Sequence, residues 1–177
     1  MQAMSVQKKF ERKYLPEFVY GAIDGSVTTF AVVAGAMGAY LGPGIVIILG
    51  FANLFADGFS MAISNYLSTK AKNEIAKKPE KNELKSAMAT FFSFLLVGFI
   101  PLLSFILAMI LKSSVIISYQ FELSMVFTGI ALIIVGWFKG EVTGKHKFKS
   151  SLETLVIGGV AAALAFGAGY LIRGIVG

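Results

Sequence analysis

The sequence contains no cysteine, and charged residues are scarce. Without cysteine, the chain forms no disulfide and offers no thiolate for a metal site, an iron–sulfur cluster or thiol catalysis. Only 15% of the 177 residues are charged and 56% are hydrophobic, whereas a soluble domain carries about 25% charged residues. Polar surface is therefore too scarce to cover the apolar side chains in water, and the same composition excludes intrinsic disorder.

Charged residues are missing from four long stretches of the chain, at residues 25–56, 86–111, 123–138 and 154–172. Apolar runs of about 18 residues or more are typical of membrane-spanning helices. A tight turn at residues 41–44, which includes Pro43, divides the first stretch into two helices. We expect one all-α transmembrane domain over residues 1–177, with five spans near residues 19–40, 45–67, 87–111, 118–138 and 155–172.

The basic residues lie between these runs, which argues against a nucleic-acid partner despite the net charge of +6. With five spans, 14 of the 16 Lys and Arg residues fall on one side, at residues 8–13, in a short loop at 69–85 and at residues 139–149. Because lysine and arginine favour the cytoplasmic side, we expect a cytoplasmic N-terminus. We interpret the loop at 69–85 as a solvated anchor, with a contact to lipid headgroups or a partner as the alternative.

Two aspartates, Asp24 and Asp57, lie inside the first two predicted spans. An ionisable group within a bilayer faces protein or water and marks a functional site by default. Each aspartate precedes a glycine, which lets another backbone or an ion approach closely. The competing interpretation is that both side chains only hydrogen-bond to backbone groups.

Helical spacing predicts which polar residues accompany these aspartates. Residues four apart share a helix face, and on the second helix this spacing joins Asn53, Asp57, Met61 and Asn65. On the first helix, a shared face joins Glu17, Gly21, Asp24 and Thr28. Because the two helices are adjacent and antiparallel, we expect Asp24, Asp57 and Met61 to converge in the cytoplasmic half of the membrane.

Carboxylates together with a thioether suit a divalent transition metal. We expect Asp24, Asp57 and Met61 to hold this metal, with the amide side chains of Asn53 and Asn65 as further ligands. Oxygen ligands alone favour Mg²⁺ or Ca²⁺, and the softer sulfur of Met61 shifts the preference toward Fe²⁺ or Mn²⁺. For Met61 alone, apolar packing is the simpler interpretation, because methionine commonly fills gaps in helical cores.

Small residues four apart indicate close helix packing. Gly21 and Gly25 form one such pair, and Ala163 and Gly167 form another. Packing within one subunit and dimerisation explain these pairs equally well. Five helices are few to enclose an ion path, so we expect a homodimer with the path at its interface.

Glu153 lies at the predicted start of the fifth helix, where a negative charge is favourable. We therefore expect Glu153 to cap this helix, with gating or metal capture as the alternative. His146 lies in a basic loop and is expected to be solvated.

The sequence resembles the vacuolar iron transporter (VIT) family over about residues 17–172, and the resemblance is strongest around Asp24 and Asp57. Two motifs are the most specific, YGAIDGSVTTFAVVAG at residues 20–35 and GFANLFADGFSM at residues 50–61, the latter followed by NYLS at 65–68. Weaker matches lie at residues 139–144 and 151–159.

The resemblance implies a homodimer of five-helix subunits in the lipid bilayer, with an ion pathway formed by the first two helices of each subunit. It implies export of Fe²⁺, and in many members Mn²⁺, from the cytosol in exchange for protons. It also implies that Asp24 and Met61 hold the metal, and Asp57 matches the second aspartate of the motif. Two features depart from the family: a short lysine-rich loop replaces a glutamate-rich cytoplasmic domain, and Asn65 stands where relatives commonly have an acid.

We therefore expect a divalent-metal transporter that is not an enzyme and holds no permanently bound cofactor. An intramembrane aspartyl protease is one alternative, although its Gly-x-Gly-Asp and Pro-Ala-Leu signatures are absent. A non-transporting membrane scaffold is another. No organelle signal is evident, so we expect a prokaryotic plasma membrane.

Overall fold

The computed structural model describes residues 6–77 and 79–176, and this part of the chain consists of helices joined by short connections, without strands. Its helices are α1 (Val6–Gly38), α2 (Pro43–Ile75), α3 (Glu83–Gly98), the 3₁₀ helix η1 (Ile100–Leu102), α4 (Leu103–Leu111), α5 (Ser114–Ser118), α6 (Gln120–Thr143) and α7 (Lys147–Val176). Five segments are long and apolar enough to cross a membrane. The all-α class and the five predicted spans are thereby confirmed.

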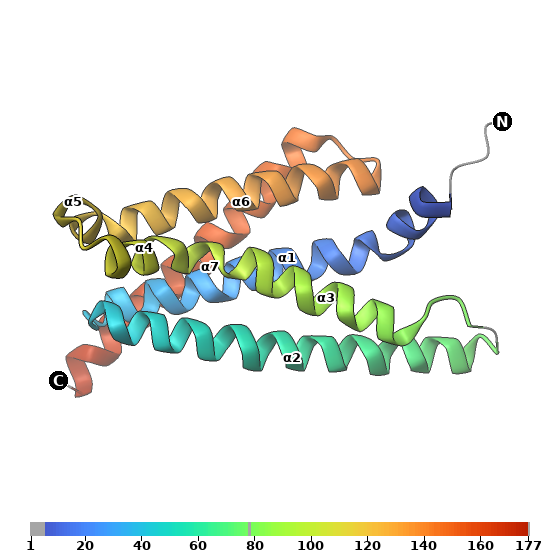
Figure 1. Ribbon diagram of the computed structural model, residues 1–177, viewed down its shortest axis with the longest axis horizontal. Helices are drawn as coiled ribbons and strands as arrows, with labels where there is room; N and C mark the ends of the chain where they lie inside the picture. The colour runs from blue at the N-terminus through green and yellow to red at the C-terminus, as the bar shows by residue number, and fades with distance from the viewer. Residues whose placement is uncertain (1–5, 78, 177) are drawn as a thin grey trace.

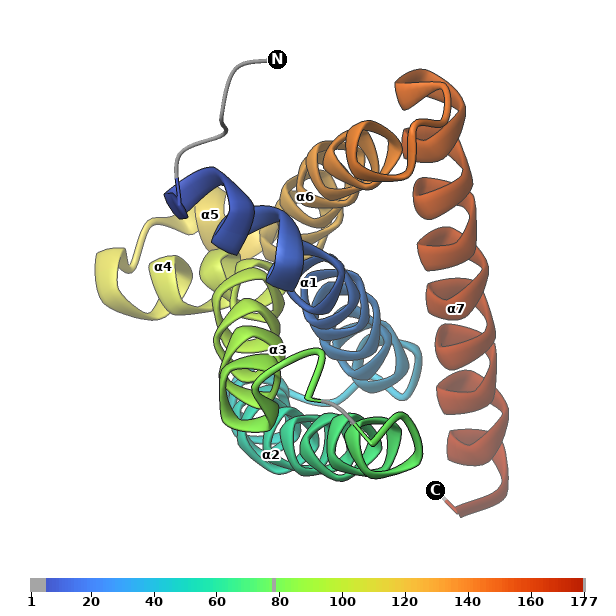
Figure 2. The same cartoon turned by 90° about the vertical axis from the view of Figure 1, so that its right-hand side faces the viewer.

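Helix α1 occupies the middle of the bundle. It packs against α2 and α3 on one side and against α6 and α7 on the other (Figures 1 and 2). Helix α7 lies at the edge of the bundle, and only 11% of its most apolar 18-residue segment is buried. The face that α1 turns toward its neighbours therefore lies inside the subunit, whereas much of α7 is open.

Several helices extend beyond the apolar runs that predicted them. Helix α2 continues to Ile75 and α3 begins at Glu83, so the connection is shorter than the 69–85 loop expected from composition. The hydroxyl of Thr69 donates to Asn65 Oδ1 at 3.2 Å, and Asn73 is buried against the chain that follows. Polar contacts of this kind stabilise the helix beyond the end of its apolar run. Hydropathy therefore predicts the edge of the bilayer but does not predict the end of the helix.

Glycines bring α1 and α3 close together. A side chain at Gly21 would collide with the backbone of Thr90, and one at Gly25 would collide with the backbone of Phe94. Gly98 of α3 lies against the carbonyl group of Gly25. The Gly21/Gly25 pair is therefore used for packing within the subunit, which was one of the two interpretations of this motif.

The third span is interrupted, which the hydropathy pattern did not predict. Pro101 has no backbone N–H and therefore cannot continue the α-helical hydrogen bonds, and residues 100–102 form a 3₁₀ turn. The Pro101 carbonyl accepts a hydrogen bond of 2.6 Å from the hydroxyl of Ser124 on α6. This bond satisfies a buried polar group and fixes the interruption against α6.

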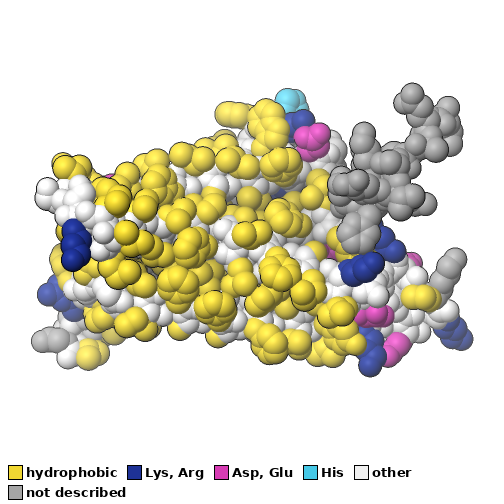
Figure 3. Space-filling view, in the orientation of Figure 1, with side chains coloured by type: hydrophobic (Ala, Val, Ile, Leu, Met, Phe, Trp, Pro, Cys, Tyr) yellow, Lys and Arg dark blue, Asp and Glu magenta, His cyan; other side chains and the backbone are white. Residues whose placement is uncertain are grey.

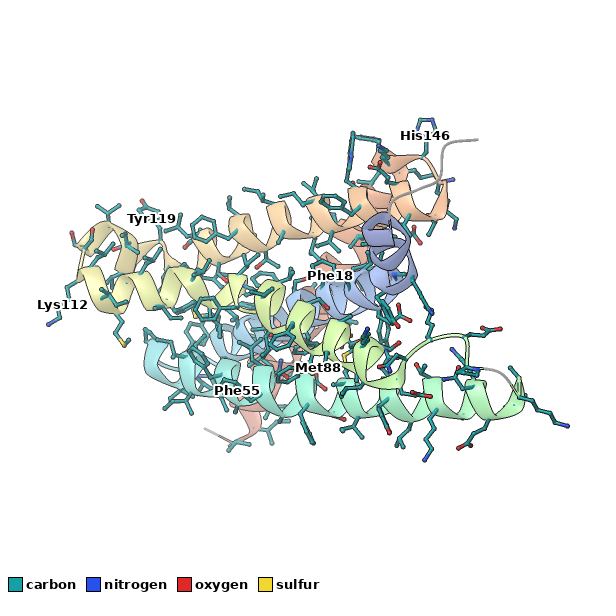
Figure 4. The ribbon with its side chains drawn as sticks, turned by 45° about the vertical axis from the view of Figure 1, so that its right-hand side comes forward. Phe18, Phe55, Met88, Lys112, Tyr119 and His146 are labelled. Carbon is teal, nitrogen blue, oxygen red and sulfur yellow. The ribbon has the colours of Figure 1, made fainter. Side chains whose placement is uncertain are left out.

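The surface divides into an apolar middle and charged ends (Figure 3). We define the basic end as the end that carries the α2–α3 and α6–α7 connections, whereas Lys112 lies at the other end, far from His146 (Figure 4). Between them, large apolar side chains face outward, among them Phe55 and Met88, which are 59% and 43% exposed. This surface fits a multi-pass membrane protein whose sides contact lipid.

Candidate metal site

Asp24 and Asp57 lie near the middle of the spans Lys13–Gly38 and Pro43–Ile75. Both are half-buried, and their carboxylates are close enough to interact electrostatically. Among the described residues, neither carboxylate has a hydrogen-bond or ion-pair partner. The structure therefore does not support the competing interpretation, in which both side chains hydrogen-bond to backbone groups. Two unpaired carboxylates at this depth can hold a cation or a proton.

Asn53 lies one turn before Asp57 on α2 and reaches toward α1. Its amide Nδ2 donates to the hydroxyl of Thr29 at 3.3 Å. Within the described part of the chain, the carbonyl Oδ1 of Asn53 has no hydrogen-bond partner. Asn53 is thus held by its nitrogen and presents an oxygen, which is the atom that a divalent cation prefers.

Asn65 is bound differently, although it belongs to the same stripe of α2. Its Nδ2 donates to the hydroxyl of Thr90 on α3 at 2.6 Å, and its Oδ1 accepts from Thr69 at 3.2 Å. Both polar atoms of Asn65 are therefore engaged in structural hydrogen bonds. Of the two amides predicted as ligands, Asn53 is the one whose oxygen has no hydrogen-bond partner among the described residues.

Met61 is half-buried and packs against the main hydrophobic core of the subunit. Its surroundings therefore support the packing interpretation as well as a role as a ligand. Thr28 lies one turn beyond Asp24 and donates its hydroxyl to the Asp24 carbonyl at 2.8 Å. This bond joins Thr28 to the backbone of α1 and leaves the Asp24 carboxylate free.

Two accessory predictions have different outcomes in the fold. The Ala163/Gly167 pair on α7 is open, because a side chain added at Gly167 would meet nothing within 4 Å. Glu153 does not cap α7, since the helix begins at Lys147 and has no acidic residue in its first turn. Glu153 instead pairs with Lys139 at 3.3 Å. The capping prediction was wrong because it placed the helix start at the edge of the apolar run.

Sequence reasoning missed a polar cavity at the basic end of the bundle. Its volume is about 600 Å³, and it is lined by α1, by the last turns of α2 and by residues 80 and 81. Glu17 lies in this cavity and forms an ion pair of 2.6 Å with Lys81. The spacing of Glu17 and Asp24 on one face of α1 was the available signal, because it places Glu17 about 10 Å along the helix from Asp24.

The aspartate pair is incomplete as a metal site within one subunit. The described residues contain no group of three or more His, Cys, Asp or Glu side chains that could hold a metal ion. Divalent cations take four to eight ligands, depending on the metal. Further ligands would have to come from Asn53, from Met61 or from outside the subunit.

Comparison with known proteins places these features in a family. The sequence model described as the VIT family matches residues 15–83 and 75–170, so its two matches meet at the α2–α3 connection. A vacuolar iron transporter of Plasmodium berghei is 26% identical over 228 positions, which cover 92% of this chain and 84% of that protein. This alignment is longer than the chain, so the relative carries inserted residues.

Another relative aligns without a long insertion. Vacuolar iron transporter homolog 3 of Arabidopsis thaliana is 31% identical over 171 positions, which cover 88% of this chain and 81% of that protein. Vacuolar iron transporter 1 of Eucalyptus grandis is 25% identical over 213 positions, which cover 85% of this chain and 83% of that protein. Like the Plasmodium alignment, this one is longer than the chain. The family matches include both aspartates and most or all of each of the five spans. The chain therefore belongs to the VIT family.

Proposed function

We propose that this protein transports a divalent transition metal, Fe²⁺ and also Mn²⁺, out of the cytosol. The observation that carries the proposal is the pair of unpaired carboxylates, Asp24 and Asp57, at mid-span on neighbouring helices. A charge at this depth is costly, so an intramembrane carboxylate without a partner marks a functional site. The names of the relatives support iron as the cargo.

We propose that Asp24 and Asp57 bind the metal through their oxygens and that Asn53 and Met61 supply further donors. The carbonyl oxygen of Asn53 has no partner among the described residues, which supports its assignment. The thioether of Met61 would favour Fe²⁺ over harder ions such as Mg²⁺.

We propose proton antiport on the basis of the same pair of carboxylates. Two carboxylates that repel each other in a medium of low dielectric constant are not both stable as anions once the metal has left. Protons would then replace the metal, and their return to the cytosol would complete the cycle. We further propose that the basic end faces the cytosol, since lysine and arginine favour that side.

A homodimer is part of the proposal. The exposed side of α2 carries Ser60 and Ser64 within the span, next to the half-buried Asp57. Polar side chains inside a bilayer face protein or water more often than lipid. A second copy covering this side of α2 would shield these residues and add ligands to the incomplete site. We keep the prokaryotic plasma membrane as the predicted location of this protein. The word 'vacuolar' describes the relatives and comes from their names.

The test is Fe²⁺ flux into proteoliposomes that contain both a metal reporter and a pH reporter. We expect metal uptake with opposite proton movement, and we expect Asp24→Asn to abolish both while the protein still inserts. Glu122→Gln is the matched control, because Glu122 is an exposed carboxylate outside the site. Undiminished flux through Asp24→Asn would overturn the site, and absence of any divalent-metal flux would return the scaffold and protease interpretations.

A further inference from the structure

The cavity at the basic end contains a carboxylate that is only partly satisfied. The Glu17 side chain is 12% exposed, and its Oε1 accepts a hydrogen bond of 2.6 Å from Lys81 Nζ. The second oxygen, Oε2, is buried and has no hydrogen-bond partner. A buried carboxylate oxygen without a partner is costly, so this position favours a cation that can contact both oxygens.

Lys81 is held over Glu17 by the chain around it. Asn73 of α2 donates to the Lys81 carbonyl at 2.8 Å and accepts from the Glu80 N–H at 2.9 Å. On the other side, the Asn82 N–H donates to the hydroxyl of Tyr14 at 3.1 Å. The backbone of residues 80–82 is therefore fixed to both α1 and α2. These hydrogen bonds position the Lys81 backbone so that its side chain reaches Glu17. The contact is therefore more defined than an ion pair between mobile surface side chains.

The cavity adjoins the residues of the proposed pathway. Asn65, which lines it, belongs to the α2 stripe that continues to Met61 and Asp57. Glu17 shares a face of α1 with Asp24, about two turns away. A cation held at Glu17 would thus lie between the solvent at the basic end and the aspartate pair.

We propose that Glu17 forms an outer binding site for a divalent metal cation and that the ammonium group of Lys81 occupies this site when no metal is present. This inference rests on the proposed transport function, and it adds that the Lys81 ammonium group competes with the metal for Glu17. A lysine ammonium group is a compact charge on a flexible stem, and Lys81 is 33% exposed. It can therefore leave Glu17 for solvent when a divalent ion, which can use both carboxylate oxygens, arrives.

Competition of this kind sets the metal concentration at which transport begins. The test compares the half-saturating Fe²⁺ concentration for flux in proteoliposomes of the full chain. Removing the competitor with Lys81→Gln should lower this concentration by about three- to tenfold, the range expected for loss of one partly buried ion pair. Lys81→Arg, which keeps the positive charge, should stay near the value of the unmodified protein.

Two controls separate the site from a general effect of surface charge. Lys147→Gln breaks the exposed ion pair with Glu141, which is 2.9 Å long and lies at the same end of the bundle. It should leave the half-saturating concentration unchanged. Glu17→Gln should raise that concentration, and Lys81→Gln should then have no further effect, because residues that act through one contact are not additive.

The result that would overturn the inference is an unchanged value for Lys81→Gln, an equal shift for Lys147→Gln, or a full Lys81→Gln effect in the Glu17→Gln background. Mn²⁺ binding in detergent, followed by the electron paramagnetic resonance signal of the free ion, gives a second readout. Measured in Asp24→Asn, it should also tighten about three- to tenfold on Lys81→Gln. Absence of flux from the unmodified protein would reject transport, whereas the binding measurement would still decide the role of Lys81.

Discussion

Asn65 of α2 and Thr90 of α3 are joined by a hydrogen bond of 2.6 Å from the asparagine amide to the threonine hydroxyl. Thr90 is fully buried, and its own hydroxyl donates to the Ser86 carbonyl at 3.2 Å. Asn65 therefore fastens α2 to α3 beside the cavity that contains Glu17. The amide at this position has a structural role even though it was predicted as a metal ligand.

Placing an acid at position 65 tests whether a further carboxylate strengthens the response to the metal. We predict that Asn65→Asp lowers the half-saturating Fe²⁺ concentration for flux, because a further carboxylate attracts the cation. We also predict a lower thermal midpoint, because the bond to Thr90 loses its donor, at a cost of about 1 kcal/mol. Flux titrations and thermal unfolding in detergent measure the two effects. A weaker response to Fe²⁺ would contradict the prediction.

Met61 is both a proposed ligand and a packing residue, and Met61→Leu separates the two roles. Leucine keeps nearly the same volume, so a cost in stability below about 1.5 kcal/mol is expected. We predict that Fe²⁺ flux falls relative to Mn²⁺ flux, because the softer sulfur donor has been removed. The same ratio of Fe²⁺ to Mn²⁺ flux in both proteins would leave Met61 with a packing role alone.

Close approach of α1 and α3 predicts strong sensitivity at Gly25. We expect Gly25→Ala to lower the midpoint of thermal unfolding by about 5 °C or more, because the new methyl group meets the backbone of Phe94. Gly159→Ala is the control, since a side chain there meets nothing within 4 Å. An equal loss for both variants would show that helix–helix contact is not the cause.

The bond between Ser124 and the Pro101 carbonyl gives a fourth prediction. Ser124→Ala removes the hydroxyl that donates to the buried Pro101 carbonyl and should cost about 0.5–1.5 kcal/mol of stability. Ser118→Ala, at an exposed position, should change stability by less than about 0.5 kcal/mol. Differential scanning fluorimetry in detergent compares the two. Equal thermal midpoints for these two variants would mean that the Pro101 carbonyl finds another partner.

The sequence was sufficient to predict the five helices and the placement of Asp24 and Asp57 on facing helices. Both follow from local patterns, namely long apolar runs and the helical repeat. Helix ends were not predictable, since α2 continues to Ile75 through polar residues that pair with one another and with the following chain. Hydropathy describes the bilayer and carries no information on such contacts.

Contacts between distant parts of the chain were also out of reach. Glu17 and Lys81 are 64 residues apart, and their pairing depends on the Asn73 and Tyr14 hydrogen bonds that fix residues 80–82. The partners of Asn53 and Asn65, Thr29 and Thr90, likewise lie 24 and 25 residues away. Helical spacing places residues on a face, but it does not say which groups the opposing helix offers.

The interruption at Pro101 gives the third span a mechanical character of its own. Helix α3, before the break, packs on α1 and α2, whereas α4, after it, packs mainly on α6. A continuous α-helix resists bending because several hydrogen bonds must distort together, and a proline-containing turn has already given up part of that ladder. The span therefore consists of two helical segments joined by a proline-containing turn. A bend at this turn would distort fewer hydrogen bonds than a bend within either segment.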